Sequence, residues 1–243
     1  RDHRQPAIAE LGYRAMSTFM NPTVTYEEGA EDEIHDHILS GGQVVIAPNH
    51  LLNTDQYNIA ALAASERVLH PLKRHTFVLA RPDILSKNMA QRIGVDAMGA
   101  IPAWREKDDK DKTEEARQLR SAATAMLLET CVYRIVERGD HAALFKEGTR
   151  NNGDVSRLLP FRNGGGNIVY EARRQGANVR TLPVAQRYRV VDGETKKRHA
   201  DIRIGRLVDL PPQTRDEVPA YTARTQDAVQ RLLDEIYEMG TAA

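Results

Sequence analysis

Short runs of apolar residues alternate with longer helical patterns along most of the chain, and this alternation limits the possible folds more than any other feature. The run at residues 44–47 follows a pair of glycines and is typical of a strand buried on both faces. Comparable runs or extended segments occur at residues 77–80, 95–103, 142–145, 179–185 and 202–208. Helical patterns separate them, at residues 55–66, 84–93, 113–138 and 165–175. This order predicts an α/β fold, a single layered domain with a largely parallel central sheet flanked by helices.

The first 40 residues follow a different pattern. An apolar stripe runs along one side of a predicted helix, formed by Ile8, Leu11, Ala15, Met16 and Phe19. An acidic stretch at residues 27–36 then indicates a connector and the start of a second helix. We predict an N-terminal helical segment at residues 1–40, whose stripe packs on the core, and one domain at residues 41–243. The alternative for the first helix is docking on a membrane surface.

Composition excludes several classes of protein. Lys+Arg and Asp+Glu both number 34, so the net charge is zero. A general nucleic-acid binder usually carries a basic excess, and nucleic acid is therefore not a predicted partner. The one cysteine, Cys131, excludes an internal disulfide, and its helical context predicts a buried structural thiol. No run approaches the roughly 18 apolar residues that a membrane span needs.

A histidine and an aspartate lie where a predicted strand gives way to a predicted helix. His50 follows the strand at residues 44–47, and Asp55 lies in the first helical turn. The carboxyl ends of strands in α/β sheets are where ligands bind. An aspartate bonded to Nδ1–H of a histidine fixes the tautomer and leaves Nε2 free to take a proton. The pair is therefore a candidate general base for attack of a hydroxyl on a thioester.

A second group of polar residues follows the predicted strand at residues 142–145. Gly148 lets the backbone approach a ligand closely. Arg150 offers a two-pronged contact with phosphate, and Thr149 adds a hydroxyl. Glu147 has two alternative roles, to orient Arg150 or to bond a substrate hydroxyl. Like the first group, these residues come just past a predicted buried strand.

With these residues in view, the chain resembles the phospholipid/glycerol acyltransferases, which include the 1-acylglycerol-3-phosphate and glycerol-3-phosphate enzymes. That family carries Asn-His, four residues and then Asp, and Asn49, His50 and Asp55 match this motif. It also carries Gly-x-Ile-Pro-x-x-Arg, which residues 99–105 match with Arg105 at the end. Motifs in the family's order are much more specific than a lone His-Asp pair.

Two further motifs extend the resemblance. The family's Phe-Pro-Glu-Gly-Thr-Arg is matched at residues 145–150, with Lys146 in place of the usual Pro. Its Val-Pro-Val-like element is matched by residues 182–184, around Pro183. Lys146 either adds a charge near the phosphate or only alters the loop. A second departure is Asn151, which replaces a common Ser.

The resemblance implies a role for each matched residue. His50 would be the general base and Asp55 its orienting partner. The glycerol phosphate would be bound by Arg105, Glu147, Gly148, Thr149 and Arg150. Supporting residues would be Asn49, Lys146 and Pro183. The acyl donor would be acyl-CoA or acyl-carrier protein, and the family's fold is an α/β sheet flanked by helices.

We therefore predict an acyltransferase that acts on 1-acylglycerol-3-phosphate and gives phosphatidic acid, attached peripherally at the cytoplasmic face of a membrane. The alternatives are a glycerol-3-phosphate acyltransferase, an acyltransferase for another lipid or glycolipid, a thioester hydrolase and a lipid-binding protein without activity. No cofactor is predicted, because a thioester is already activated. No metal is predicted either, since His35 and His37 diverge on a helix and no third ligand is evident.

Overall fold

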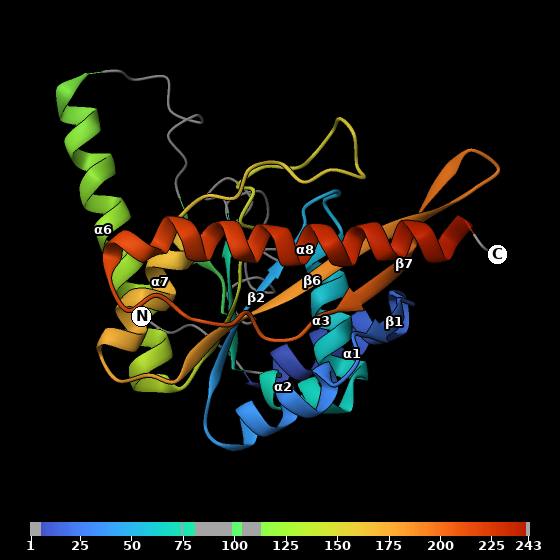
Figure 1. The fold of residues 1–243 in the computed structure, drawn as a ribbon, viewed down its shortest axis with the longest axis horizontal. Helices are drawn as coiled ribbons and strands as arrows, with labels where there is room; N and C mark the ends of the chain where they lie inside the picture. Colours follow the sequence, from blue (N-terminus) through green and yellow to red (C-terminus); the bar gives the residue numbers. More distant parts are fainter. Residues whose placement is uncertain (1–5, 74, 81–98, 104–112, 242–243) are drawn as a thin grey trace.

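The structure is a computed structural model that describes residues 6–73, 75–80, 99–103 and 113–241 (Figure 1). Its α-helices are α1 (Pro6–Phe19), α2 (Ala30–Leu39), α3 (Asp55–Ser65), α6 (Glu114–Arg138), α7 (Gly164–Arg174) and α8 (Val218–Thr241), with short 3-10 helices η1 (Arg67–Leu72) and η3 (Arg215–Glu217). Its strands are β1 (Thr23–Tyr26), β2 (Gln43–Pro48), β3 (Thr76–Ala80), β4 (Ile101–Pro102), β5 (His141–Ala143), β6 (Val179–Val191) and β7 (Glu194–Ile204). The helix predicted at residues 84–93 lies outside the described residues.

The described strands form one seven-stranded sheet in the order β1-β7-β6-β2-β5-β3-β4. Neighbouring strands are parallel throughout, except for β6 and β7, which form an antiparallel hairpin. This architecture confirms the predicted α/β fold with a largely parallel sheet. The two strands that precede the predicted polar groups, β2 and β5, are neighbours at the centre. Their carboxyl ends therefore meet at the same edge.

Helices cover both faces of the sheet, and α8 lies across β6 and β7 (Figure 1). Val44 and Ile46 of β2 belong to a core shared with α1, α2 and α3. Val45, between them, belongs to a second core shared with α6, α7 and α8. Because both faces are buried, the strand reads as a continuous apolar run. Cys131 lies fully buried in the second core, where burial raises the pKa of its thiol to about 12, as expected of a structural thiol.

The N-terminal 40 residues contribute a strand as well as helices. β1 pairs with β7, so this segment forms one edge of the sheet. α1 packs against α3, as predicted, but through Ala9 and Tyr13, which are buried. Three members of the predicted stripe are exposed instead, Ala15, Leu11 (67%) and Phe19 (45%), and the guanidinium of Arg198 lies over the Phe19 ring. Met16 of the predicted stripe does pack against the core, so the prediction was right for this residue and wrong for the exposed members.

The β6–β7 hairpin is longer than the sequence predicted. Strands were expected at residues 179–185 and 202–208, whereas the pairing continues outward to Val191 and Glu194. Asp192 and Gly193 form the two-residue turn, with φ values of 54° and 74°. Positive φ at both positions is the signature of the type I′ hairpin turn, for which Asp-Gly is favoured. The extension is charged and mostly exposed, so no apolar run marks it.

A buried histidine ties β5 to β2. Nδ1 of His141 accepts a hydrogen bond from the Val44 N–H at 3.0 Å, so the ring is neutral and its proton is on Nε2. Burial lowers the pKa of His141 to about 4. The neighbouring His75 and His37 act in the same direction, and Asp140 opposes them.

We predict that stability falls as the pH decreases from 6.5 to about 4. In this window the unfolded chain takes up a proton that folded His141 does not, so the free energy of unfolding drops by about 3 kcal/mol. Above this window the contribution is fully present. Urea unfolding at several pH values measures it. His141→Asn, whose Oδ1 can still accept from the Val44 N–H, should flatten this part of the profile, and an unchanged slope would contradict the assignment.

Candidate active site

His50 and Asp55 meet at the carboxyl end of β2. The strand ends at Pro48 and α3 begins at Asp55, so the connecting turn folds the histidine back over the first helical turn. Nδ1 of His50 lies 2.7 Å from Oδ2 of Asp55. This distance is that of a charge-assisted hydrogen bond in which the imidazole N–H donates to the carboxylate. The structure places the two side chains as a hydrogen-bonded dyad.

Asp55 is fully buried and accepts three hydrogen bonds besides the one from His50. Oδ2 accepts from the backbone N–H groups of Leu51 at 2.6 Å and Leu52 at 2.9 Å, and Oδ1 accepts from the Tyr188 hydroxyl at 2.7 Å. Rotating the carboxylate would leave buried donors unpaired, which is costly. The fixed carboxylate therefore holds the imidazole in one orientation and keeps the lone pair on Nε2.

A buried polar network supports Asp55 from β6 and α3. The Tyr188 hydroxyl accepts from Nδ2 of Asn58 at 3.0 Å and lies 2.9 Å from Oγ1 of Thr54. Nδ2 of Asn58 also donates to Oε1 of Gln186 at 3.0 Å. Gln186 and Asn49 are joined by hydrogen bonds of 2.8, 2.9 and 3.0 Å. Burial and the adjacent charge of Asp55 raise the pKa of Tyr188, so its hydroxyl remains a donor.

Asn49 was predicted as a supporting residue, and the structure bonds it to Gln186; Gln186, Tyr188 and Asn58 were not identified from the sequence. The predicted strand stopped at residue 185, immediately before Gln186. Gln186 and Tyr188 are both buried, and they are two residues apart on β6. Polar side chains that continue the period-two pattern of a buried strand are the signal that could have found them.

Phe145 holds the other side of the imidazole. Its ring is stacked on that of His50, with 4.3 Å between centroids and 26° between planes. The His50 side chain is 20% exposed. No hydrogen bond to another described residue occupies Nε2. A fixed imidazole with an open Nε2 can accept a proton from a hydroxyl placed beside it.

Glu147 connects the two polar groups. Oε1 accepts from the His50 N–H at 2.7 Å, and Oε2 accepts from the Leu159 N–H at 2.9 Å. Only 3% of the residue is exposed. Burial raises the pKa of the carboxyl group, and the two N–H donors act in the opposite direction. From the sequence we predicted that Glu147 would contact the substrate. In the structure, both of its carboxylate oxygens accept hydrogen bonds from backbone N–H groups.

The remaining residues of the Glu-Gly-Thr-Arg turn are half-buried or exposed, whereas Lys146, which precedes the turn, is buried. Gly148 has a φ of 66°, in the left-handed region. Arg150 is exposed and Thr149 is half-buried. Lys146 is buried, with Nζ 5.7 Å from the centroid of the Tyr221 ring and no hydrogen bond to the described residues. Burial lowers the pKa of Lys146 to about 7, and its amine points into the interior rather than toward a ligand.

Two predicted site residues remain, Pro183 and Arg105. Pro183 is buried in β6 opposite Ala47 of β2, and its carbonyl accepts from the Gly205 N–H at 3.1 Å. It therefore joins β6 to the residue that follows β7, beside the strand that leads to His50. Arg105 lies outside the described residues. Within the described ranges, no group of three or more His, Cys, Asp or Glu side chains could hold a metal ion.

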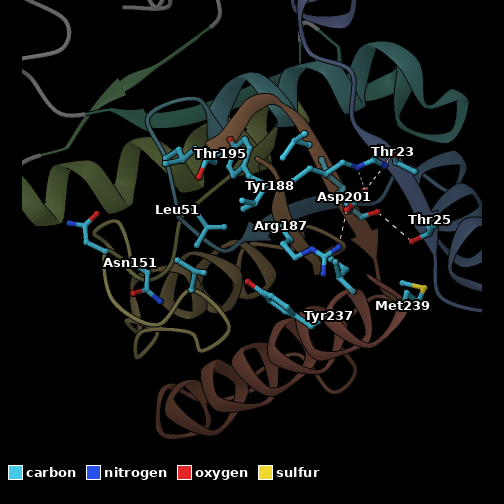
Figure 2. Close-up of a pocket in the computed structure, with 18 residues that line it drawn as sticks. Thr23, Thr25, Leu51, Asn151, Arg187, Tyr188, Thr195, Asp201, Tyr237 and Met239 are labelled. Carbon is cyan, nitrogen blue, oxygen red and sulfur yellow. Dashed lines mark hydrogen bonds and ion pairs between the residues drawn. The ribbon is translucent and has the colours of Figure 1, made fainter. Parts of the chain in front are cut away.

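A groove of about 1100 Å³ has Leu51, the residue after His50, in its lining (Figure 2). Leu51, the neighbour of His50, lines one end, and Met239 of α8 lies toward the other. Charged side chains on its wall are paired with each other, since Asp201 bonds Arg187 at 3.2 Å and Arg189 at 2.6 Å. Apolar side chains line most of the remainder: Leu52, Val155, Val190, Val191, Ile202, Ile236 and Tyr237. A long apolar ligand fits such a lining without leaving a charge unpaired.

The dyad lies at the carboxyl edge of the parallel sheet, with the Glu-Gly-Thr-Arg turn bonded against it through Glu147. The chain belongs to the acyltransferase family, whose model, described as Acyltransferase, matches residues 29–187. This is the family of 1-acylglycerol-3-phosphate acyltransferases and related enzymes, and membership supports a lipid acyltransferase activity. The match includes both members of the dyad. No curated protein matches the chain.

We predict that Tyr188→Phe lowers kcat about 10-fold, a fraction of the roughly 10²–10⁴-fold that general-base catalysis supplies. Without the hydroxyl, Oδ1 of Asp55 loses a donor and the dyad is less firmly oriented, at a stability cost of about 1–3 kcal/mol. Steady-state acyl transfer and thermal unfolding measure the two effects. Tyr133→Phe, at an exposed tyrosine of α6, is the matched control. If Tyr188→Phe kept the wild-type kcat, Tyr188 would have no role in orienting the dyad.

Proposed function

We propose that the protein transfers a fatty acyl group from acyl-CoA or acyl-carrier protein to the free hydroxyl of 1-acylglycerol-3-phosphate, giving phosphatidic acid. The observation that carries this proposal is the dyad itself. Nδ1 of His50 is bonded to the fully buried Asp55, and no described residue occupies Nε2. A thioester is an activated acyl donor, so the reaction needs a base and a positioned hydroxyl but neither cofactor nor metal.

In the proposed reaction, His50 acts first as base and then as acid. The acceptor hydroxyl gives its proton to Nε2 while its oxygen bonds to the carbonyl carbon of the thioester. The hydrogen bond to Asp55 stabilises the imidazolium that forms. The tetrahedral intermediate then collapses, the carbon–sulfur bond breaks, and His50 returns the proton to the departing thiolate. The products are the new ester and a free thiol.

Arg150 is the proposed contact for the acceptor's phosphate. It is exposed, and it follows directly on the turn that contacts the dyad through Glu147. A guanidinium can bind a phosphate through two parallel hydrogen bonds. We assign Arg105 and Thr149 to the same phosphate. Glu147 acts differently in this proposal, because it positions the backbone of His50.

We infer that the acyl chain of the donor lies in the groove shown in Figure 2. Leu51, which follows His50 in the chain, lines this groove, and in this proposal the thioester of a chain bound there lies near Nε2. The paired charges of Asp201, Arg187 and Arg189 support an apolar occupant, since they need no partner from the ligand. Burial of about 0.8 kcal/mol per methylene would favour long chains.

A lipid acceptor implies that the protein works at a membrane surface, and we propose peripheral attachment at the cytoplasmic face. Exposed apolar side chains on α1, Leu11 and Phe19, support contact with lipid. Among the described helices, none is long and apolar enough to cross a bilayer.

The proposal is tested by incubating the purified protein with palmitoyl-CoA and either 1-acylglycerol-3-phosphate or glycerol-3-phosphate, and by identifying lipid products with mass spectrometry. We expect phosphatidic acid from the first acceptor. His50→Ala should lower kcat by about 10²–10⁴-fold, because the base is lost. His35→Ala, at an exposed histidine of α2, should keep wild-type activity.

Each alternative has its own result in this assay. Acylation of glycerol-3-phosphate alone would keep the mechanism and reject the acceptor, and acylation of a glycolipid alone would also reject the role of Arg150. Free fatty acid formed equally with and without acceptor would identify a thioester hydrolase. Lipid binding without turnover of any acceptor would favour a binding protein.

We predict that Met239→Trp shifts the donor preference toward shorter chains. A larger side chain at the end of the groove far from Leu51 should exclude the last methylenes of a palmitoyl chain. If two methylenes lose their burial, kcat/KM for palmitoyl-CoA should fall about 10-fold relative to kcat/KM for octanoyl-CoA. Competition between the two donors, followed by product analysis, measures this ratio. Met126→Trp, at an exposed methionine of α6, is the control. An unchanged ratio would place the chain elsewhere.

A further inference from the structure

An arginine outside the predicted motifs lies against the Glu-Gly-Thr-Arg turn. Arg162 immediately precedes the N-cap of α7, and its side chain passes over Gly148. A Cβ added to Gly148 would lie 3.0 Å from Nε and 3.1 Å from Cδ of Arg162. The missing side chain at Gly148 thus makes room for the guanidinium. Arg162 is nevertheless exposed, so one side of its charged group faces solvent.

Hydrogen bonds fix the backbone around Arg162 to the same turn. Its own N–H donates to the carbonyl of Lys146 at 2.9 Å. Three residues earlier, the Leu159 N–H donates to Oε2 of Glu147 at 2.9 Å. Oε1 of that carboxylate accepts from the His50 N–H. A single side chain therefore links the segment that carries Arg162 to the dyad, and the two are held in a fixed relation.

The charge of Arg162 has no fixed counter-ion in the part of the chain that the structure describes. Its side chain makes no hydrogen bond or ion pair there, whereas Arg157 pairs with Asp234 and Arg174 with Glu171. Glu147, the acid nearest in the turn, has both oxygens engaged by backbone N–H groups. The N-terminus of α7, which follows directly, adds a partial positive charge. This surface is therefore prepared for an anion.

We propose that Arg162 is a second guanidinium that binds the phosphate of the acceptor, together with Arg150. This inference rests on the proposed function. Two guanidinium groups match the double charge of a phosphate monoester better than one, and both come from segments attached to the same turn. Arg162 does not line the groove assigned to the donor's acyl chain, which separates its site from that chain.

The test compares Arg162→Met and Arg162→Lys with the wild type in the acyl-transfer assay. kcat and KM are measured separately for 1-acylglycerol-3-phosphate and for palmitoyl-CoA. Arg162→Met should raise KM for the acceptor about 10-fold, with kcat and the donor KM unchanged. Inorganic phosphate, used as an inhibitor competing with the acceptor, should lose about the same factor in potency. Arg162→Lys should fall between, because it keeps the charge but loses the fork.

Arg174→Met, at the other end of α7, is the matched control and should behave as wild type. An unchanged acceptor KM in Arg162→Met would overturn the inference. A rise in the donor KM alone would also overturn it, and would assign Arg162 to the phosphates of CoA. A fall in kcat together with a lower unfolding temperature would overturn it in favour of a structural role. If the wild type acylates no phosphate-bearing acceptor, the proposed function fails as well, whereas wild-type turnover with an insensitive variant rejects Arg162 alone.

Discussion

The buried carboxylate of Asp55 is the interaction on which the rest of the site depends. It receives hydrogen bonds from His50, Leu51, Leu52 and Tyr188, which come from the turn after β2 and from β6. A buried charge that lost such donors would cost several kcal/mol, at roughly 1–3 kcal/mol for each unpaired group. The turn, the start of α3 and the outer half of β6 must therefore keep their relative positions. The same constraint that stabilises the fold at this edge also orients the imidazole.

Glu147 applies the same principle one strand away. β5 lies beside β2, so the turn after β5 meets the turn after β2 at one edge of the sheet. The Glu147 carboxylate joins them through the backbone N–H groups of His50 and Leu159, and the Phe145 ring packs on the imidazole. Two motifs almost 100 residues apart in sequence thereby become one site. Their proximity follows from the strand order, since parallel neighbours present their carboxyl ends together.

Local patterns in the sequence were enough to predict the layers and the dyad. Burial on both faces leaves continuous apolar runs, and these fall on the central strands β2 and β5. His50 and Asp55 are five residues apart, so the start of α3 alone brings them together. Tyr188 is 133 residues from Asp55, on a charged hairpin whose inward-facing positions depend on register. No local pattern specifies such a contact.

The direction in which the Lys146 side chain points could not be predicted from the sequence, for a similar reason. Its stem runs past Gly165 at the start of α7, where an added Cβ would lie 2.7 Å from Cε of the lysine. Whether this space exists depends on how α7 docks on the turn, which is a tertiary property. The groove is likewise assembled from β1, β6, β7, α8 and two loops, and none of these segments signals a pocket by itself.

The negative charges of the site are buried, and its positive charges are exposed. Asp55 and Glu147 are buried and engaged by donors, whereas Arg150 and Arg162 are exposed at the same edge. Since the chain carries no net charge, this positive surface comes from placement rather than from composition. Lys146 adds little to it, because burial lowers the pKa of its amine to about 7. Guanidinium groups stay charged at any physiological pH. In the proposed reaction the phosphate-binding charges are therefore constant, and the proton transfer is confined to the imidazole of His50.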